Sequence, residues 1–329
     1  MKRRDVLILL GSAAAARPLV AGAQPARAVP IVGLVSIAAS ATDAANFRGF
    51  LEQMRELGYI DGANIIFDKR FADGSEELID GYVADLVRRP VDIIVVTGTR
   101  ESLTAMRATS SIPIVTIVAP DPIGMGLAQS LARPGGNITG LTTMDLDIYG
   151  KRLELLGQAV PGLRKAAILI SPDKPMYRTG SPWASAVSAD ARSFWLTLHI
   201  VEADETNFDG ALSRLVAAGT QGLVVSSDGI FLAHRQQLVD STIRHRLPAI
   251  FAYRPQADAG GLMAYAARVD DLSRRAAFFV DRILKGAKPA DLPIEQPTRF
   301  TLVLNLRTAK IFGLDLPAVL LAQAAEVIE

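Results

Sequence analysis

The strongest constraint on the fold is a repeated alternation of short apolar runs with amphipathic helical segments. "VDIIVV" at 91–96 and "IPIVTIVA" at 112–119 are almost wholly apolar, which is typical of strands buried on both faces of a parallel sheet. Segments such as "EELIDGYVADLVRR" at 76–89 instead place apolar residues on one face of a helix. Strands that alternate with helices in this order predict a doubly wound parallel sheet.

The pattern occurs twice, so we predict an α/β protein with two such lobes. A length of 329 residues agrees, because about 100–200 residues per domain is usual. The first unit is expected to have strands at 30–36, 64–71, 91–96 and 112–119 and helices at 43–57, 76–89 and 102–110. The second is expected to have strands at 165–171, 197–203, 222–227 and 248–253 and helices at 148–160, 183–195, 208–219 and 230–245.

The C-terminal part does not fit a simple two-lobe count. It contains strand-like runs at 261–267 and 300–306, a helical pattern at 270–286, the proline-rich segment 289–297 and a helical end from Thr308. Such a tail can cross back between the lobes and so form a multi-strand hinge. We therefore predict a first lobe at 29–145 plus about 262–292, and a second lobe at 146–261 plus about 293–329.

The N-terminus has the three parts of a secretory signal peptide over residues 1–23. A basic start with Arg3 and Arg4 precedes an apolar run from 6 to 16, and Ala21-Gly22-Ala23 forms a cleavage site. The adjacent arginines leave both the general and the twin-arginine export routes open. No later run is long and apolar enough for a membrane span, so we expect an exported, soluble mature protein.

Composition excludes several function classes. Lys and Arg number 35 against 34 Asp and Glu, so no basic excess favours nucleic acid as a partner. The chain has no cysteine, which removes disulfides, thiolate metal ligands and cysteine nucleophiles. The three histidines are dispersed, and we expect no metal site and no cofactor.

Ligands of open α/β sheets bind beyond the carboxyl ends of the strands. Hydroxyl groups are frequent there, and the helix that follows each strand presents free N–H groups that favour an anion. The candidate binding residues at the predicted strand ends are Ser36, Thr97, Gly98, Thr99, Asp121, Ser171, Ser227, Asp228 and Tyr253.

A structural role competes with ligand binding at several of these positions. Asp121-Pro122 fits a helix N-cap followed by proline at the first helical position, and Ser171-Pro172 fits the same pattern. Asp121 is also the single acid at a strand end of the first lobe, where a carboxylate suits a ligand ammonium group. Arg100 and Arg254 are candidates either for a ligand carboxylate or for the solvated surface.

Sequence signatures of enzymes are missing. Gly124-Met125-Gly126 lacks the third glycine of a dinucleotide fingerprint, and no phosphate-binding loop, zinc-protease motif or nucleophile elbow occurs. No serine has an evident base partner. We therefore predict that the protein is not an enzyme.

Longer motifs give a family resemblance. "DPIGMGLAQSLARPGGNITG" at 121–140 and "ILKGAKPADLPIEQPT" at 283–298 are the most specific, and "FRGFLEQMRELGYIDGANI" and "VDIIVVTGT" support them. Over about residues 30–329 the chain resembles the ABC-transporter substrate-binding proteins of the tryptophan/tyrosine-binding (TrpX-like) family, which have the type I periplasmic binding protein fold.

The resemblance implies a periplasmic, monomeric protein whose lobes close on a small ligand and then dock on an inner-membrane ABC permease. The implied ligand is an aromatic or other apolar amino acid, or a related organic acid. Asp121 would face its ammonium group, Thr97 to Thr99 would donate to its polar groups, and Tyr253 and Tyr265 would stack on its side chain. Tyr177 and Trp183 would line the cleft or pack within the second lobe.

Other functions remain open from the sequence. A ligand-sensing input module for a membrane receptor shares this fold and this export signal. An exported α/β enzyme is disfavoured by the absent catalytic motifs, and a DNA-binding repressor of the same fold by the signal peptide.

Overall fold

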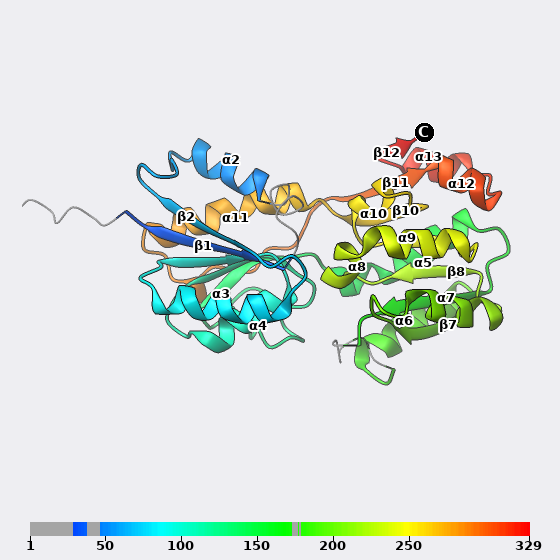
Figure 1. Ribbon diagram of the computed structural model, residues 1–329, viewed down its shortest axis with the longest axis horizontal. Coiled ribbons are helices and arrows are strands. Elements are labelled where there is room, and N and C mark those ends of the chain that lie inside the picture. The colour runs from blue at the N-terminus through cyan, green and yellow to red at the C-terminus, as the bar shows by residue number, and fades with distance from the viewer. Residues whose placement is uncertain (1–28, 38–46, 173–176, 178) are drawn as a thin grey trace, which may run out of the picture.

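The computed structural model describes residues 29–37, 47–172, 177 and 179–329. Two α/β lobes lie next to each other along the long axis of the molecule, and extended segments connect them (Figure 1). The predicted signal peptide and the first residues of the helix predicted at 43–57 lie outside the described residues. No helix within the described ranges has the length and apolar character needed to span a bilayer.

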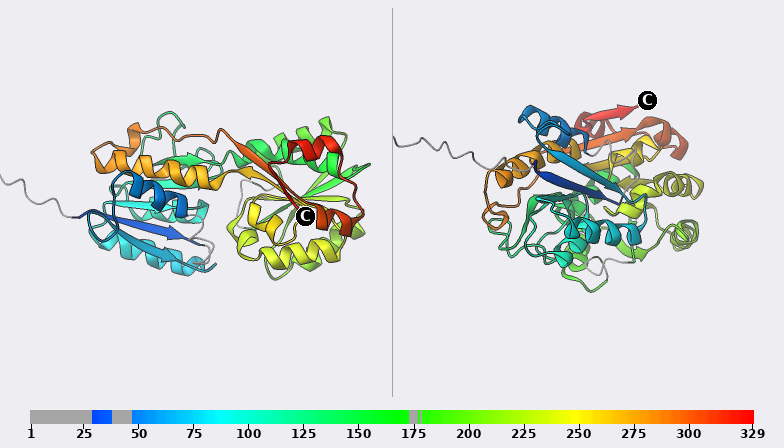
Figure 2. Two further views of the ribbon diagram at one scale, coloured as in Figure 1. Left: turned by 90° about the horizontal axis from the view of Figure 1, so that it is seen from above. Right: turned by 60° about the vertical axis from the view of Figure 1, so that its left-hand side comes forward.

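The first lobe contains a parallel five-stranded sheet in the order β2-β1-β3-β4-β5. Its strands are β1 (Ile31–Ser36), β2 (Ile66–Phe71), β3 (Ile93–Val96), β4 (Ile114–Ala119) and β5 (Ile138–Thr142). Helices α2 (Arg48–Glu56) and α11 (Val269–Leu284) pack on one face, where Phe50 and Met54 are fully buried. Helices α3 (Glu76–Arg88) and α4 (Thr99–Ala108) cover the other face (Figure 2).

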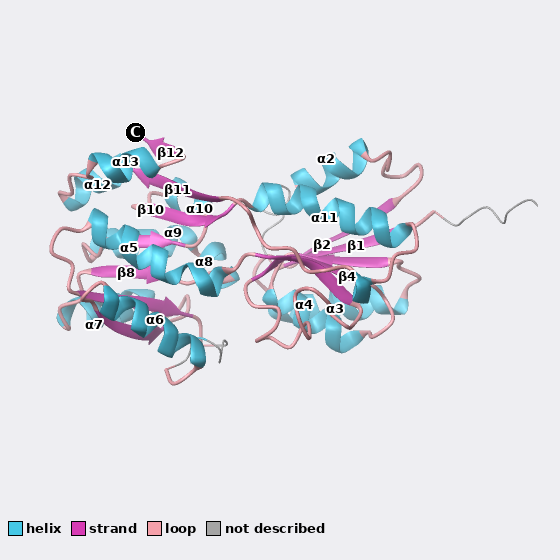
Figure 3. Cartoon of the chain, turned by 180° about the vertical axis from the view of Figure 1, so that it is seen from behind, coloured by secondary structure: helices cyan, strands magenta, loops and turns pink. Residues whose placement is uncertain are grey.

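The second lobe contains a seven-stranded sheet in the order β12-β11-β10-β9-β8-β6-β7, in which only the pairing of β10 with β11 is antiparallel. Its strands are β6 (Lys165–Ile170), β7 (Thr197–Glu202), β8 (Gly222–Val225), β9 (Ala249–Phe251), β10 (Met263–Ala267), β11 (Phe300–Asn305) and β12 (Glu326–Ile328). Figure 3 shows its helices on both faces of this sheet.

One face of the second sheet packs against α5 (Tyr149–Ala159), α6 (Pro182–Ser193), α12 (Leu306–Phe312) and α13 (Ala318–Gln323). The other face packs against α7 (Phe208–Ala217), α8 (Gly229–Ala233), α9 (Arg235–Arg244) and α10 (Arg254–Asp258). The predicted doubly wound parallel sheets in two lobes are therefore confirmed.

Three segments join the lobes. The first crosses near 143–145, between β5 and the 3-10 turn Asp145–Ile148. The second crosses near Arg268, between β10 and α11, and the third at about 296–299, between Glu295 and β11. The predicted boundary near 262 is wrong, because β10 pairs with β9 and β11 in the second sheet. The boundary near 293 also shifts, because Glu295 exchanges backbone hydrogen bonds with β5 of the first lobe.

Three local features also differ from the sequence predictions. The helix predicted at 230–245 is divided into α8 and α9 at His234, whose backbone φ is −98°. Neither the short strand β12 nor the short helix α10 was expected. The segment after Asp121 forms turns rather than a regular helix, yet Asp121 makes the predicted cap-type hydrogen bond, because its Oδ1 accepts the backbone N–H of Gly124.

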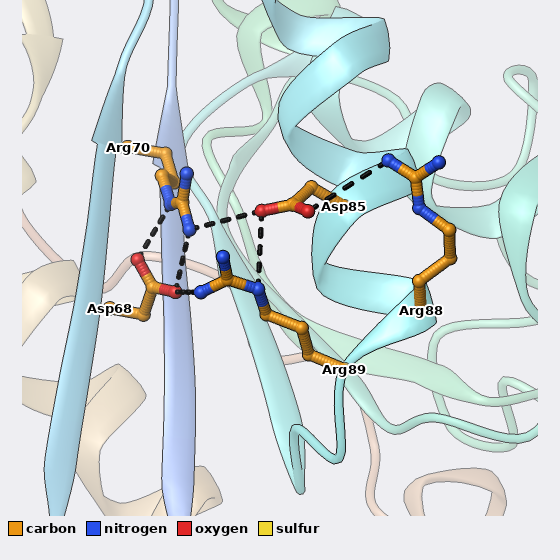
Figure 4. A network of polar contacts seen from close by, with 5 residues as sticks. All are labelled: Asp68, Arg70, Asp85, Arg88 and Arg89. Atoms are coloured by element: carbon orange, nitrogen blue, oxygen red, sulfur yellow. Dashed lines mark hydrogen bonds and ion pairs between the residues drawn. The ribbon is translucent and has the colours of Figure 1, made fainter.

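Helix α3 shows how local sequence determines an element. The Ser75 hydroxyl accepts a hydrogen bond from the backbone N–H of Leu78 at 3.3 Å, and Glu76 and Glu77 lie in the positive first turn. At its other end, Arg88 and Arg89 join an ion-pair network with Asp85 of the helix and Asp68 and Arg70 of the edge strand β2 (Figure 4). Charged side chains on an edge strand oppose pairing with another sheet.

Candidate functional site

A cleft of about 460 Å³ lies between the two lobes, at the carboxyl ends of their central strands. Strand order reverses between β1 and β3 in the first sheet and between β6 and β8 in the second, and such reversals open a crevice in α/β folds. The first lobe lines the cleft with Ile37, Thr97, Gly98, Thr99, Glu101 and Pro120, among others. The second lobe contributes Ser171, Asp204, Ser227, Asp228, Ile230 and Tyr253, among others.

Most of the predicted residues come together in this cleft. Thr97, Gly98, Thr99, Ser171, Asp228 and Tyr253 all line it. Ser36 is buried next to it, because the Thr97 hydroxyl donates to the Ser36 hydroxyl at 2.5 Å. Asp121 and Tyr265 are not among the lining residues.

The first-lobe wall is organised around Glu101, which sequence reasoning missed. Glu101 lies in the first turn of α4, and its side chain is buried, with the residue 1% exposed. One carboxylate oxygen accepts the backbone N–H of Ile37 at 2.8 Å and lies 3.4 Å from the Thr97 hydroxyl. Glu101 therefore joins the loop after β1 to the loop after β3, and it places a carboxylate in the cleft.

Gly98 makes room for this carboxylate. A Cβ atom at position 98 would lie 2.6 Å from Oε2 of Glu101, well inside van der Waals contact. The sequence signal was present, since an acid three residues after the glycine of "TGTRE" is a common arrangement at a helix start. Glu101 lies beyond the residues that directly follow β3, where ligand contacts are expected in such folds.

In the second lobe, Asp228 caps the short helix α8. Its Oδ1 accepts the backbone N–H of Ile230 at 3.2 Å, which agrees with the predicted capping role. The neighbouring Ser227 hydroxyl donates to Oδ2 of Asp145 at 2.5 Å. The loop after β8 is thus fixed to the end of the first crossing by a buried hydrogen bond.

Tyr253 stands at the end of β9, and its backbone N–H donates to the Gln256 side chain at 3.1 Å. Burial raises the pKa of the Tyr253 phenol well above its usual range, and the nearby carboxylates of Asp145 and Asp228 raise it further. The phenol therefore stays protonated at neutral pH, and it provides a neutral polar and aromatic surface to the cleft.

The Asp121 carboxylate belongs to its own turn. Its Oδ1 accepts the backbone N–H of Gly124 at 2.9 Å, and a Cβ on Gly124 would collide with its Oδ2. Asp121 also lies near Asp147, on the second-lobe side of the first crossing. Burial, and then the charge of Asp121, raise the pKa of Asp147. The ammonium-binding role of Asp121 stays a prediction.

Tyr265 lies on β10 beside the crossings, where its ring stacks on Phe300 with centroids 5.8 Å apart. The two candidate arginines have acidic partners. Arg100 contacts Asp80 at 2.8 Å and Glu76 at 3.6 Å, while Arg254 contacts Glu326 at 2.5 Å.

The aromatic residues of the second lobe divide between cleft and core. Tyr149, Tyr177 and Trp183 form a compact cluster with ring centroids 4.9 to 6.2 Å apart, and all three belong to the hydrophobic core. Tyr177 and Trp183 therefore pack within the lobe. Among the described lining residues, Tyr253 is the only aromatic. The described part of the chain also holds no group of three or more potential metal-ligating side chains.

Two doubly wound lobes around a ligand-sized cleft define the class of type I periplasmic binding proteins. The family described as ABC transporter substrate binding protein matches residues 31–328, and this chain belongs to that family. The family comprises exported solute-binding proteins rather than enzymes.

Individual relatives are distant. A tyrosine-binding protein of Clostridioides difficile is 24% identical over 274 residues, which are 82% of this chain and 76% of that protein. A Streptococcus pneumonia ABC domain solved in complex with L-Trp superimposes with a TM-score of 0.82 at 22% identity, covering 91% of this chain and 99% of that one. The ligand-free, open structure of a Clostridium difficile substrate binding protein has a TM-score of 0.68 at 20% identity, with the same coverage.

Proposed function

We propose that this protein binds a small ligand, an aromatic or other apolar amino acid or a related organic acid, and delivers it to an inner-membrane ABC permease. The observation that carries this proposal is the cleft itself, which both lobes line at the reversal points of their sheets. Its volume of about 460 Å³ lies within the range usual for small-molecule sites.

The residues of the two walls suit a polar ligand with an apolar part. Thr97 and Thr99 supply hydroxyls from one lobe, Ser171 and Ser227 supply them from the other, and Tyr253 supplies an aromatic ring. The ten-residue helix α4 begins at Thr99, so its free N–H groups favour a ligand carboxylate. Related proteins that bind tyrosine or L-Trp support an amino acid as the ligand.

Function follows from closure of the lobes. A ligand that contacts both walls stabilises the closed state more than the open one, and only such differential binding shifts the equilibrium. The three crossings allow rotation of one lobe against the other while each sheet stays intact. Closure brings together surfaces from both lobes, which we propose the permease recognises. We further propose that the protein acts as a periplasmic monomer and binds no nucleic acid.

A thermal-shift screen of the mature protein with amino acids and aromatic acids tests this proposal. A true ligand at about 100 times its Kd adds about 2.7 kcal/mol to the unfolding free energy and so raises Tm. We expect stabilisation by at least one amino acid or related acid. If the folded protein responds to none of them, the proposed ligand class is wrong.

A further inference from the structure

We infer that the ligand is a zwitterionic amino acid held across the cleft, with its ammonium group on Glu205 of the second lobe and its carboxylate on the first lobe. The inference rests on the proposed function, because it takes the cleft between the lobes as the ligand site. It narrows that proposal, since an organic acid without an amine lacks one of the two contacts.

Glu205 carries a carboxylate oxygen that lacks a partner. The residue lies in the loop after β7 and lines the cleft. Its Oε2 is buried, yet this atom has no hydrogen-bond partner among the described residues. The backbone carbonyl of Glu205 accepts the side-chain amide of Gln237 at 2.7 Å, which anchors the loop. A buried polar atom without a partner is costly, and a ligand N–H⁺ group would supply the missing hydrogen bond.

The other acids that line the cleft are already engaged. Asp204 is adjacent to Glu205 in the chain, and its Oδ1 accepts the backbone N–H of Thr206 at 3.0 Å and the Thr206 hydroxyl at 2.6 Å. Each of the four accepts a hydrogen bond or forms an ion pair within its own lobe: Glu76, Glu101, Asp204 and Asp228. Glu205 is therefore the acid best placed to receive a ligand ammonium group.

The first lobe presents positive charge on the opposite wall. Thr99 and Arg100 line the cleft in the first turn of α4, whose free N–H groups carry partial positive charge. The Arg100 Nε is buried without a hydrogen-bond partner among the described residues, although the two Nη atoms contact Glu76 and Asp80. A ligand carboxylate can accept from this Nε and from the helix N-terminus. The two walls thus offer unpartnered groups of opposite charge, which match the two ends of a zwitterion.

A ligand bound in this way links the lobes through its own two charges. An amine without the carboxylate pairs with Glu205 alone, and an acid without the amine pairs with the first lobe alone. Neither gains a second charged contact when the lobes close, whereas the amino acid does, and a ligand shifts closure only by such differential binding. Closure should therefore require both charged groups on one molecule.

Three matched sets of compounds test the inference by calorimetry and by small-angle X-ray scattering, in which closure reduces the radius of gyration. Each set contains an amino acid, the amine left without its carboxylate and the acid left without its amine. The sets are L-tyrosine, tyramine and 3-(4-hydroxyphenyl)propionate; L-tryptophan, tryptamine and indole-3-propionate; and L-leucine, 3-methylbutylamine and 4-methylpentanoate. We expect at least one amino acid to bind and close the protein, and its amine and acid to bind about tenfold or more weakly and without closure.

Glu205→Gln separates the charge from the fold. Glutamine keeps the size of the side chain, and Oε2 has no hydrogen bond to lose, so Tm should be retained. Affinity for the amino acid should fall about tenfold or more, while affinity for the acid of the same set should stay unchanged or rise. Asp315→Asn is the matched control, because it removes one charge from an exposed residue of the second lobe that does not line the cleft.

The outcomes distinguish the inference from the proposed function. An amine or an acid that binds and closes the protein as well as its amino acid overturns the inference and leaves the proposed function intact. Unchanged affinity for the amino acid in Glu205→Gln has the same effect, and so does binding of the acids alone. If the folded protein binds none of the compounds in the three sets, the amino-acid assignment and the inference fail together.

Discussion

Asp145 and Arg152 form a buried ion pair, with 2.7 Å between Oδ1 and Nη2 and side-chain exposures of 2% and 1%. The Arg152 Nε–H donates to the backbone carbonyl of Tyr265 at 3.1 Å, and Ser227 donates to Asp145 at 2.5 Å. The pair therefore connects the first crossing, the strand before the second crossing and a loop of the ligand cleft.

Replacing Arg152 by methionine should destabilise the second lobe strongly, because it leaves the Asp145 charge buried without its partner. We expect the unfolding free energy to fall by about 3–5 kcal/mol, measured by urea denaturation. Arg88→Met is the control, since the Arg88 side chain is 76% exposed and its contact with Asp85 is 3.8 Å long. Similar losses in the two variants would contradict a special role for the buried pair.

Gly98→Ala should lower ligand affinity while leaving stability within about 1 kcal/mol of the parent protein. The added Cβ would lie 2.6 Å from Oε2 of Glu101, and a flexible carboxylate moves more easily than backbone. Calorimetry with the tightest ligand of the thermal-shift screen gives the affinity, and thermal melting gives the stability. Gly136→Ala is a suitable control, since its Cβ meets nothing within 4 Å. Unchanged affinity would mean that the Glu101 carboxylate position is unimportant.

Asp121→Asn tests the role that the sequence predicted for Asp121. The asparagine oxygen can keep the hydrogen bond from Gly124, so the free energy of unfolding should change by less than about 0.5 kcal/mol. We expect affinity for the tightest ligand of the thermal-shift screen to change little, because Asp121 is not among the residues that line the cleft. A loss of affinity of about tenfold or more would restore Asp121 as the ammonium contact.

The network in Figure 4 predicts a pH dependence of stability. The hydrogen bond from Arg70 lowers the pKa of Asp68, and the charges of Arg70 and Arg89 act in the same direction. A lowered folded-state pKa stabilises the protein above the unfolded pKa of about 3.9, and this contribution is lost as the pH falls through the folded value. Asp68→Asn should therefore cost at most about 1 kcal/mol at pH 7 and progressively less below pH 4. If the network did not titrate, denaturation at several pH values would instead show the same difference in unfolding free energy between Asp68→Asn and the parent protein at every pH.

Periodicity predicted most of the fold because the central strands are apolar throughout and the helices have one apolar face. β3 is fully buried over Ile93–Val96, as a strand covered on both faces must be. The tail was harder to place, because the strand β10 and the helix α11 are adjacent in sequence yet belong to different lobes. Nothing in the local pattern of 261–286 indicates which sheet accepts the strand.

The site was predicted where ligand-facing residues directly follow a strand, as Thr97 and Ser171 do. Glu101 was missed because it lies one helical turn further on and reaches back over Gly98. Asp121 lies two residues after the end of β4, and its carboxylate turns toward Gly124. Position after a strand indicates the edge of the sheet, whereas side-chain direction depends on the turn that follows.

The pairing of α2 with α11 has a consequence for biosynthesis. These helices share one face of the first sheet, although more than 200 residues separate Arg48–Glu56 from Val269–Leu284. As the ribosome makes the chain, α2 covers part of this sheet face early, but the part under α11 stays exposed until about five-sixths of the protein has been synthesised. We expect the incomplete lobe to bind chaperones that recognise exposed apolar surface.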